Sequence, residues 1–271
     1  MTSEPAAEPT PQALLEPIEP SPAVRDEIIV LINDDQTRLG EIYRMLEQGL
    51  SANEIQAELG LQQNRFVWSY QRIIKSLVDG NLPGAPTVAH AVAQRFRSLL
   101  SEHTFSPEAE RVLRHNLAVL ETRASDRSSQ NRETKQALDA TNRFEAEGIP
   151  GIYVYTLPHY LHHPYDPETG RTLYKVGRSD RDVIERFRNQ TRITALPEEP
   201  VLLRVYRTDE TEKSGAIERQ FHLTLEAADH DRSTARTGGT EWFLTSLKFL
   251  DQIAGLLNVP VEAVLDDGDT D

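Results

Sequence analysis

Apolar residues recur three or four positions apart through most of the first half of the chain. This spacing places the apolar side chains on one face of a helix. Ser106 and Pro107 open one such stripe with a capping serine and a proline at the first helical position. The pattern therefore predicts an all-helical module over residues 27–123. Its first clear stripe consists of Leu39, Ile42, Tyr43 and Leu46.

The pattern changes after residue 148, where short segments rich in β-branched and aromatic residues begin. Such segments are typical of strands. The predicted fold class is α+β, in which the helical N-terminal module is followed by a small antiparallel three-stranded sheet flanked by helices, at 149–257. The expected strands are 151–157, 171–177 and 201–206, with 240–243 extended and helices at about 182–191, 212–227 and 246–257.

Three further segments carry little apolar content. Residues 1–22 are acidic and rich in proline, and we expect them to be a disordered tail. Residues 124–148 are interpreted as a linker that runs into a polar helix. Residues 258–271 are expected to form an acidic tail.

Composition excludes several classes of protein. The chain is 38% hydrophobic and 27% charged, and no apolar run is long enough for a spanning helix. It contains no cysteine, which excludes disulfides and thiol catalysis. The N-terminal segment lacks the features of a secretory signal. We expect a cytoplasmic protein with no membrane partner.

The net charge of −14 is concentrated at the two ends of the chain. Residues 1–27 carry a net charge of −5 and residues 251–271 carry −6, so the interior is nearly neutral. A locally basic surface therefore remains compatible with the composition, and nucleic acid stays among the candidate partners.

Side-chain alternation sorts the residues of the predicted strands by face. Tyr153 and Tyr155 share one face of the first strand, while Lys175 and Gly177 share one face of the second. We expect Gly177 to let either a helix or a phosphate approach the backbone closely. On the late helix, Glu218 and His222 lie four residues apart at the edge of the apolar stripe.

The order of several short motifs in the second half resembles the GIY-YIG nuclease domain. The resemblance covers about 149–245 and is closest to the branch whose second motif reads Lys-Ile/Val-Gly, with a late Glu-x-x-x-His and a Glu-Trp-Phe. The residues that carry it are Gly151-Ile152-Tyr153, Lys175-Val176-Gly177, Arg186, Glu218, His222 and Glu241-Trp242-Phe243.

The resemblance implies a role for each of these residues. Glu218 would hold one divalent ion, Mg²⁺ or Mn²⁺, and Tyr153 would orient or deprotonate the attacking water. Arg186 would stabilise the charge on the phosphoryl group. Lys175 stands where the family has its second tyrosine and would bind a phosphate oxygen or act as a base. His222 would shuttle a proton or order the surroundings of the metal.

Residues 41–77 resemble a helix-turn-helix, with helices at 41–48 and 52–59 and a third from about residue 62. Ser51 is suited to cap the second helix. Polar residues open the third helix, as in a recognition helix, and an ordinary helical bundle is the alternative. The residues predicted to bind DNA are Gln62, Gln63, Asn64 and Arg65, together with Arg178 in the second half.

The sequence thus predicts a metal-dependent endonuclease that hydrolyses DNA phosphodiester bonds, with RNA as the other possible substrate. A first alternative is a degenerate GIY-YIG-like protein that binds DNA or regulates without cutting. It is suggested by Lys175 in place of a tyrosine and Gln190 in place of a histidine. A second alternative is a protein-interaction module, suggested by the low positive charge. The oligomeric state stays open.

Overall fold

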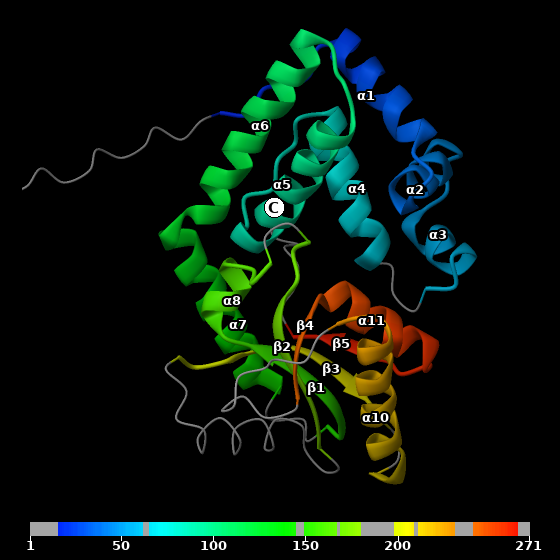
Figure 1. Ribbon diagram of the computed structural model, residues 1–271, viewed down its shortest axis with the longest axis vertical. Helices are drawn as coiled ribbons and strands as arrows, with labels where there is room; N and C mark the ends of the chain where they lie inside the picture. Colours follow the sequence, from blue (N-terminus) through cyan, green and yellow to red (C-terminus); the bar gives the residue numbers. More distant parts are fainter. Residues whose placement is uncertain are drawn as a thin grey trace, which may run out of the picture.

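The computed structural model describes residues 16–61, 65–144, 149–166, 169–179, 198–208, 211–230 and 241–264 (Figure 1). It confirms the α+β class, with a helical N-terminal part followed by an antiparallel sheet and its helices. The helices are α1 (Pro22–Asp34), α2 (Arg38–Glu47), α3 (Ala52–Glu58), α4 (Arg65–Val78), α5 (Pro86–Glu102), α6 (Pro107–Ser125), α7 (Arg127–Phe144), α8 (Pro158–His162), α10 (Thr211–Ala227) and α11 (Leu247–Leu256). The strands are β1 (Gly151–Thr156), β2 (Thr172–Ser179), β3 (Val201–Arg207), β4 (Trp242–Thr245) and β5 (Val261–Ala263).

The helical part is built around one apolar core that α1 to α6 share. The predicted caps are present, because Ser106 accepts a hydrogen bond from the backbone of Ala109 and Ser51 forms a capping box with Glu54. Every helix within the described ranges falls short of the length and hydrophobicity needed to cross a membrane. Buried members of this core include Ile28, Ile42, Val67, Phe96 and Val112.

The sheet has five strands in the order β4-β2-β1-β3-β5, and all neighbouring strands are antiparallel. The three predicted strands correspond to β1, β2 and β3, and the sequence analysis missed that the sheet extends at both edges. The segment at 240–243 was expected only to be extended, and the strand that begins within it, Trp242–Thr245, pairs with β2 as β4. Val261–Ala263 pairs with β3 as β5.

Each face of the sheet carries its own apolar cluster. Val154 and Val176 point to the face that α10 and α11 cover, together with Phe221 and Leu250 of those helices. The opposite face carries Tyr153, Tyr155, Leu202 and Val205, with Ala140 of α7 packed against them. Helix α7 contributes to both clusters, because Ala137 belongs to the first and Ala140 to the second. In Figure 1, α7 lies to the left of the sheet, whereas α10 and α11 lie to its right.

Both predicted tails extend further into the fold than expected. The residues just before α1 pack on α6, because the Ile18 backbone donates to the Asn116 amide oxygen at 2.8 Å and accepts from its nitrogen at 2.9 Å. At the other end, β5 lies inside the segment assigned to the acidic tail, and its Val261 is buried. The acids and prolines of these segments led the sequence analysis to place them outside the fold, although residues 259–265 include five apolar residues.

One other expectation needs correction. The segment at 124–148 was interpreted as a linker that runs into a polar helix. The helix is present as α7, but it begins at Arg127, packs against β3 and buries Ala137 and Ala140, so little of the segment is a linker. The connection between β1 and β2 contains the short helix α8. The helix expected at 182–191 lies outside the described residues.

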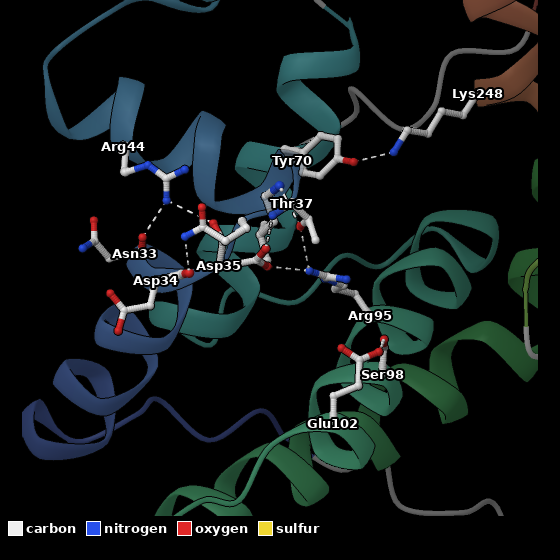
Figure 2. A network of polar contacts seen from close by, with 12 residues as sticks. Asn33, Asp34, Asp35, Thr37, Arg44, Tyr70, Arg95, Ser98, Glu102 and Lys248 are labelled. Carbon is white, nitrogen blue, oxygen red and sulfur yellow. Dashed lines mark hydrogen bonds and ion pairs between the residues drawn. The ribbon is translucent and has the colours of Figure 1, made fainter.

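The helical part and the sheet part meet where α4 approaches the start of α11. The Lys248 ammonium of α11 donates to the Tyr70 hydroxyl of α4 (Figure 2). The same ammonium lies 4.6 Å from the centre of the Tyr70 ring and 4.9 Å from that of Phe66. Nearby, the Arg95 guanidinium of α5 donates to the Asp35 carboxylate at 2.8 Å, and this pair fixes the connection between α1 and α2.

Candidate functional site

The register of β1 and β2 places the two motif strands side by side. Tyr153 lies opposite Gly177, and Tyr155 lies opposite Lys175, so all four point to one face. Strand alternation predicted the pairing within each strand, and the register between the strands brings the two pairs together. A β-carbon built on Gly177 would lie 2.5 Å from the Tyr153 hydroxyl. The glycine therefore makes room for the tyrosine ring of the neighbouring strand, rather than for a helix or a phosphate as expected.

Lys175 is a buried cation whose surroundings hold its ammonium in place. Its side chain is 8% exposed, and its Nζ lies 3.0 Å from a Glu241 carboxylate oxygen. The ammonium also lies 5.9 Å from the centre of the Tyr155 ring. That ring stacks on Tyr153 and meets Trp242 edge-on, with ring centres 6.0 and 5.6 Å apart. Burial, reinforced by the charges of Tyr153 and Glu241, raises the pKa of Tyr155.

Helix α10 presents its polar edge to an open pocket of about 300 Å³. Phe221 and Leu225 anchor the helix in the sheet core, so Glu218 and His222 lie at its edge, as predicted. His222 Nε2 lies 3.2 Å from the Val176 carbonyl oxygen, a contact that requires the proton on Nε2 and leaves Nδ1 as the acceptor. The pocket is lined by Arg178, Gly215, Glu218, Arg219, His222, Leu223 and Glu226.

Arg178 of β2 reaches across the pocket to α10. Its Nε lies 2.9 Å from the Glu218 carboxylate, and its Nη1 is 3.5 Å from the Ser214 hydroxyl. The guanidinium passes over Gly215, where a β-carbon would lie 3.4 Å from it. The Arg178 side chain is 39% exposed and that of Glu218 is 18% exposed, so the pair lies at the rim of the pocket rather than in the core.

The neighbours of Glu218 only partly offset the effect of burying its carboxylate, so its pKa lies above the usual value. Burial raises its pKa, and the negative charge of Glu241 acts in the same direction. His222 and the hydrogen-bonded Arg178 oppose this rise and lower the pKa. Glu241 therefore links two parts of the site, since it pairs with Lys175 and also acts on Glu218.

The donor set of the pocket fits one hard divalent cation held by a single carboxylate. The structure brings together no cluster of three or more His, Cys, Asp or Glu side chains that could hold a metal ion, within the described ranges. Magnesium commonly takes one or two carboxylates and keeps several waters. Glu218 supplies a hard oxygen donor, burial has already raised the pKa of that carboxyl, and the open pocket leaves room for waters.

The structure gathers only some of the predicted site residues. Arg178, Glu218 and His222 line one pocket. Tyr153 and Lys175 are buried on the opposite face of the sheet and do not line this pocket. Arg65 is the first residue of α4. Arg186 and Gln190, as well as Gln62, Gln63 and Asn64, lie outside the described residues.

Two pairings of charged residues were not predicted. Glu241 is a close partner of Lys175, and nothing in the spacing of the sequence indicates that β4 pairs with β2. Arg204 of β3 is almost fully buried and lies 3.3 Å from Asp251 of α11, which also accepts a hydrogen bond from the Tyr206 hydroxyl. This second cluster fixes α11 on the sheet, away from the pocket.

Comparison with known proteins gave a match in the second half of the chain. Residues 151–258 match the family model of the T5orf172 domain, which is a nuclease-like domain. The match begins at β1 and ends just before β5, so it contains the pocket and the β1–β2 pair. No curated protein and no solved structure gave a significant match. The second half is therefore similar to a nuclease-like domain, which indicates nucleic acid as the class of partner.

Proposed function

We propose that the second half of the chain is a metal-dependent endonuclease of the GIY-YIG type that hydrolyses DNA phosphodiester bonds at the α10 pocket. The observation that carries this proposal is the convergence of Arg178, Glu218 and His222 on one open pocket. That pocket lies inside the segment that matches a nuclease-like domain. A guanidinium can stabilise phosphoryl charge, a carboxylate can hold a metal ion, and an imidazole can transfer a proton.

In this proposal Arg178, Glu218 and His222 each have their own role in the hydrolysis. A divalent ion, Mg²⁺ or Mn²⁺, would be held by Glu218 and would supply Lewis-acid stabilisation of the phosphoryl oxygens. The Arg178 guanidinium binds phosphate oxygens through its fork of donors. His222 takes a proton at Nδ1, because Nε2 already donates to the Val176 carbonyl. By the family resemblance, Arg186 adds a further positive charge at the phosphoryl group.

In this proposal the β1–β2 pair acts from the opposite face of the sheet, and Glu241 links the two, since it pairs with Lys175 and also acts on Glu218. Lys175 is a preorganised charge donor, since Glu241 and the Tyr155 ring hold its ammonium in one place. We assign it the binding of a phosphate oxygen rather than the role of base. The Tyr153 hydroxyl, which lies over Gly177, would orient the attacking water.

For the helical part we propose DNA binding through α4, the third helix of a helix-turn-helix-like arrangement in which α2 and α3 both pack against α4. Arg65, Trp68, Arg72 and Lys75 follow helical spacing and lie on one side of α4, and Trp68 is 40% exposed. Substituting Arg72 and Lys75 by glutamine should weaken DNA binding and reduce the salt slope by about two. Binding that is insensitive to salt would instead favour a protein-interaction module.

The proposed activity is tested by incubating the purified chain with supercoiled DNA, linear DNA and RNA, in Mg²⁺, Mn²⁺ or a chelator. The expected result is conversion of supercoiled DNA to nicked or linear forms only when a divalent ion is present. Cleavage that persists in the chelator would contradict the metal assignment. The RNA arm decides between the two kinds of nucleic acid.

One observation favours the second candidate, a binding module that does not cut. Tyr153 is only 1% exposed, and the Glu218 carboxylate is already paired with Arg178. If the protein binds DNA tightly but no divalent ion supports cleavage of any substrate, this reading replaces the nuclease. Lys175→Ala should then weaken affinity modestly and reduce the salt slope by about one.

A further inference from the structure

The Glu218 carboxylate has two competing uses in the proposed site. It is the group that would hold the divalent ion, and it is also the partner of Arg178, whose Nε lies 2.9 Å from Oε2. A carboxylate that is paired with a guanidinium at this distance is a poor ligand for a metal cation. The guanidinium occupies one carboxylate oxygen and repels a second positive charge. Arg178 therefore lowers the affinity of this pocket for a divalent ion.

The arrangement around Arg178 allows its guanidinium to leave. Its hydrogen bond to the Ser214 hydroxyl is long, at 3.5 Å, and the side chain is 39% exposed at the pocket rim. Gly215 has no side chain, so the guanidinium can lie over this part of α10. A phosphate entering the open pocket would offer this guanidinium two or three charged oxygens in place of one carboxylate.

We propose that Arg178 is a latch on Glu218 that nucleic-acid phosphate releases, so that the pocket takes up its divalent ion only when substrate is present. This proposal rests on the proposed function, since it assigns Glu218 as the metal ligand. Substrate and metal are then linked reciprocally, because each removes a cost that the other would have to overcome. The free protein would bind the metal weakly, and the metal-loaded site would form only when DNA is bound.

The test measures Mn²⁺ binding to the full chain without nucleic acid, by calorimetry or by loss of the free-ion paramagnetic signal. Because the acidic termini also attract cations, only the binding that Glu218→Gln removes is counted. Arg178→Ala and Arg178→Gln should each tighten this Glu218-dependent binding by about tenfold, the size expected for a partly buried ion pair. The matched control is Arg219→Gln, which removes a charge from the same pocket and should leave the affinity near that of the wild type.

The reciprocal arm measures affinity for a labelled DNA duplex with Ca²⁺ and with chelator, by fluorescence anisotropy. Ca²⁺ should strengthen DNA binding more in the wild type than in either Arg178 variant. Two results would count against the account, and they differ. Arg178 variants whose Glu218-dependent Mn²⁺ affinity equals that of the wild type would overturn the latch alone. Mn²⁺ binding that Glu218→Gln leaves unchanged in the wild type and in the Arg178 variants would overturn the metal assignment as well.

Discussion

Lys175 is a charged residue in the middle of a sheet, and its immediate neighbours explain how it is held there. A buried ammonium is tolerated when a carboxylate pairs with it and aromatic rings cover its stem. Glu241 and Tyr155 supply both at Lys175. Strand alternation correctly predicted that Lys175 shares a face of its strand with Gly177, because alternation depends only on local geometry. It could not identify Glu241, because that contact depends on how β4 pairs with β2.

The role of this ammonium can be separated from its packing. Lys175→Met keeps most of the aliphatic volume but removes the charge, so we expect cleavage to fall by on the order of 100-fold while the fold is kept. Lys175→Arg should also be impaired, because a planar fork does not replace a compact ammonium. The check is single-turnover cleavage together with circular dichroism. Wild-type rates in both variants would show that Lys175 only fills space.

At the scale of elements, α5, α7 and α8 meet around two polar side chains. Glu133 of α7 accepts a hydrogen bond from the Thr87 hydroxyl at 2.8 Å, near the start of α5. His162 at the end of α8 lies against the same carboxylate at 3.4 Å and within 3.0 Å of the Thr134 hydroxyl. The sequence predicted α5 and the polar helix that contains α7, but not that a carboxylate of one helix would bind the first turn of another.

This junction should make stability depend on pH. Burial, with a smaller contribution from His163, lowers the pKa of His162 from 6.5 to about 4. Between these values the unfolded chain binds a proton that the folded chain does not, so the free energy of unfolding falls as the pH falls. The loss should reach about 3 kcal/mol by pH 4, measured by urea unfolding across this range. In His162→Gln the loss should be smaller, whereas the exposed-site control His103→Gln should behave as the wild type does.

A second junction of elements joins α4 to α11 through Lys248 (Figure 2). An exposed cation over aromatic rings contributes about 0.5–1 kcal/mol. We therefore expect a coupling energy of that size in a double-mutant cycle of Lys248→Met and Tyr70→Leu, measured by denaturant unfolding. If the two substitutions are additive, the contact does not hold the two parts together. The contact joins two residues that are 178 positions apart in the sequence. Helix and strand periodicity cannot predict a contact at such a separation.

At the scale of the whole molecule, the sequence indicated a helical part, a change of pattern near residue 148 and a sheet with helices. These features depend on periodicity, which is a local property. The edges of the fold could not be predicted in the same way. Val261 and Val264 lie in an acidic segment and are buried only because the β3 edge is there to receive them.

Two truncations separate the acidic end from the strand that precedes it. Deleting 265–271 removes four aspartates and should leave the unfolding midpoint near that of the full chain. Deleting 260–271 also removes β5 and should lower the free energy of unfolding by about 2–4 kcal/mol, because buried valines are lost and β3 becomes an edge. Thermal and urea unfolding measure both. Equal stability of the two truncations would mean that β5 adds nothing to the fold.

The central claim is that Glu218 in the α10 pocket serves phosphodiester hydrolysis. Its most direct test is cleavage of a supercoiled plasmid in Mg²⁺ and in Mn²⁺ by the wild type, Glu218→Gln and Glu226→Gln. Both glutamates lie on α10 and line the same pocket, so the second variant controls for the loss of one acid. We predict that Glu218→Gln lowers the rate by at least about 100-fold, while Glu226→Gln stays within a few-fold of the wild type. Cleavage by Glu218→Gln at the wild-type rate would contradict the account.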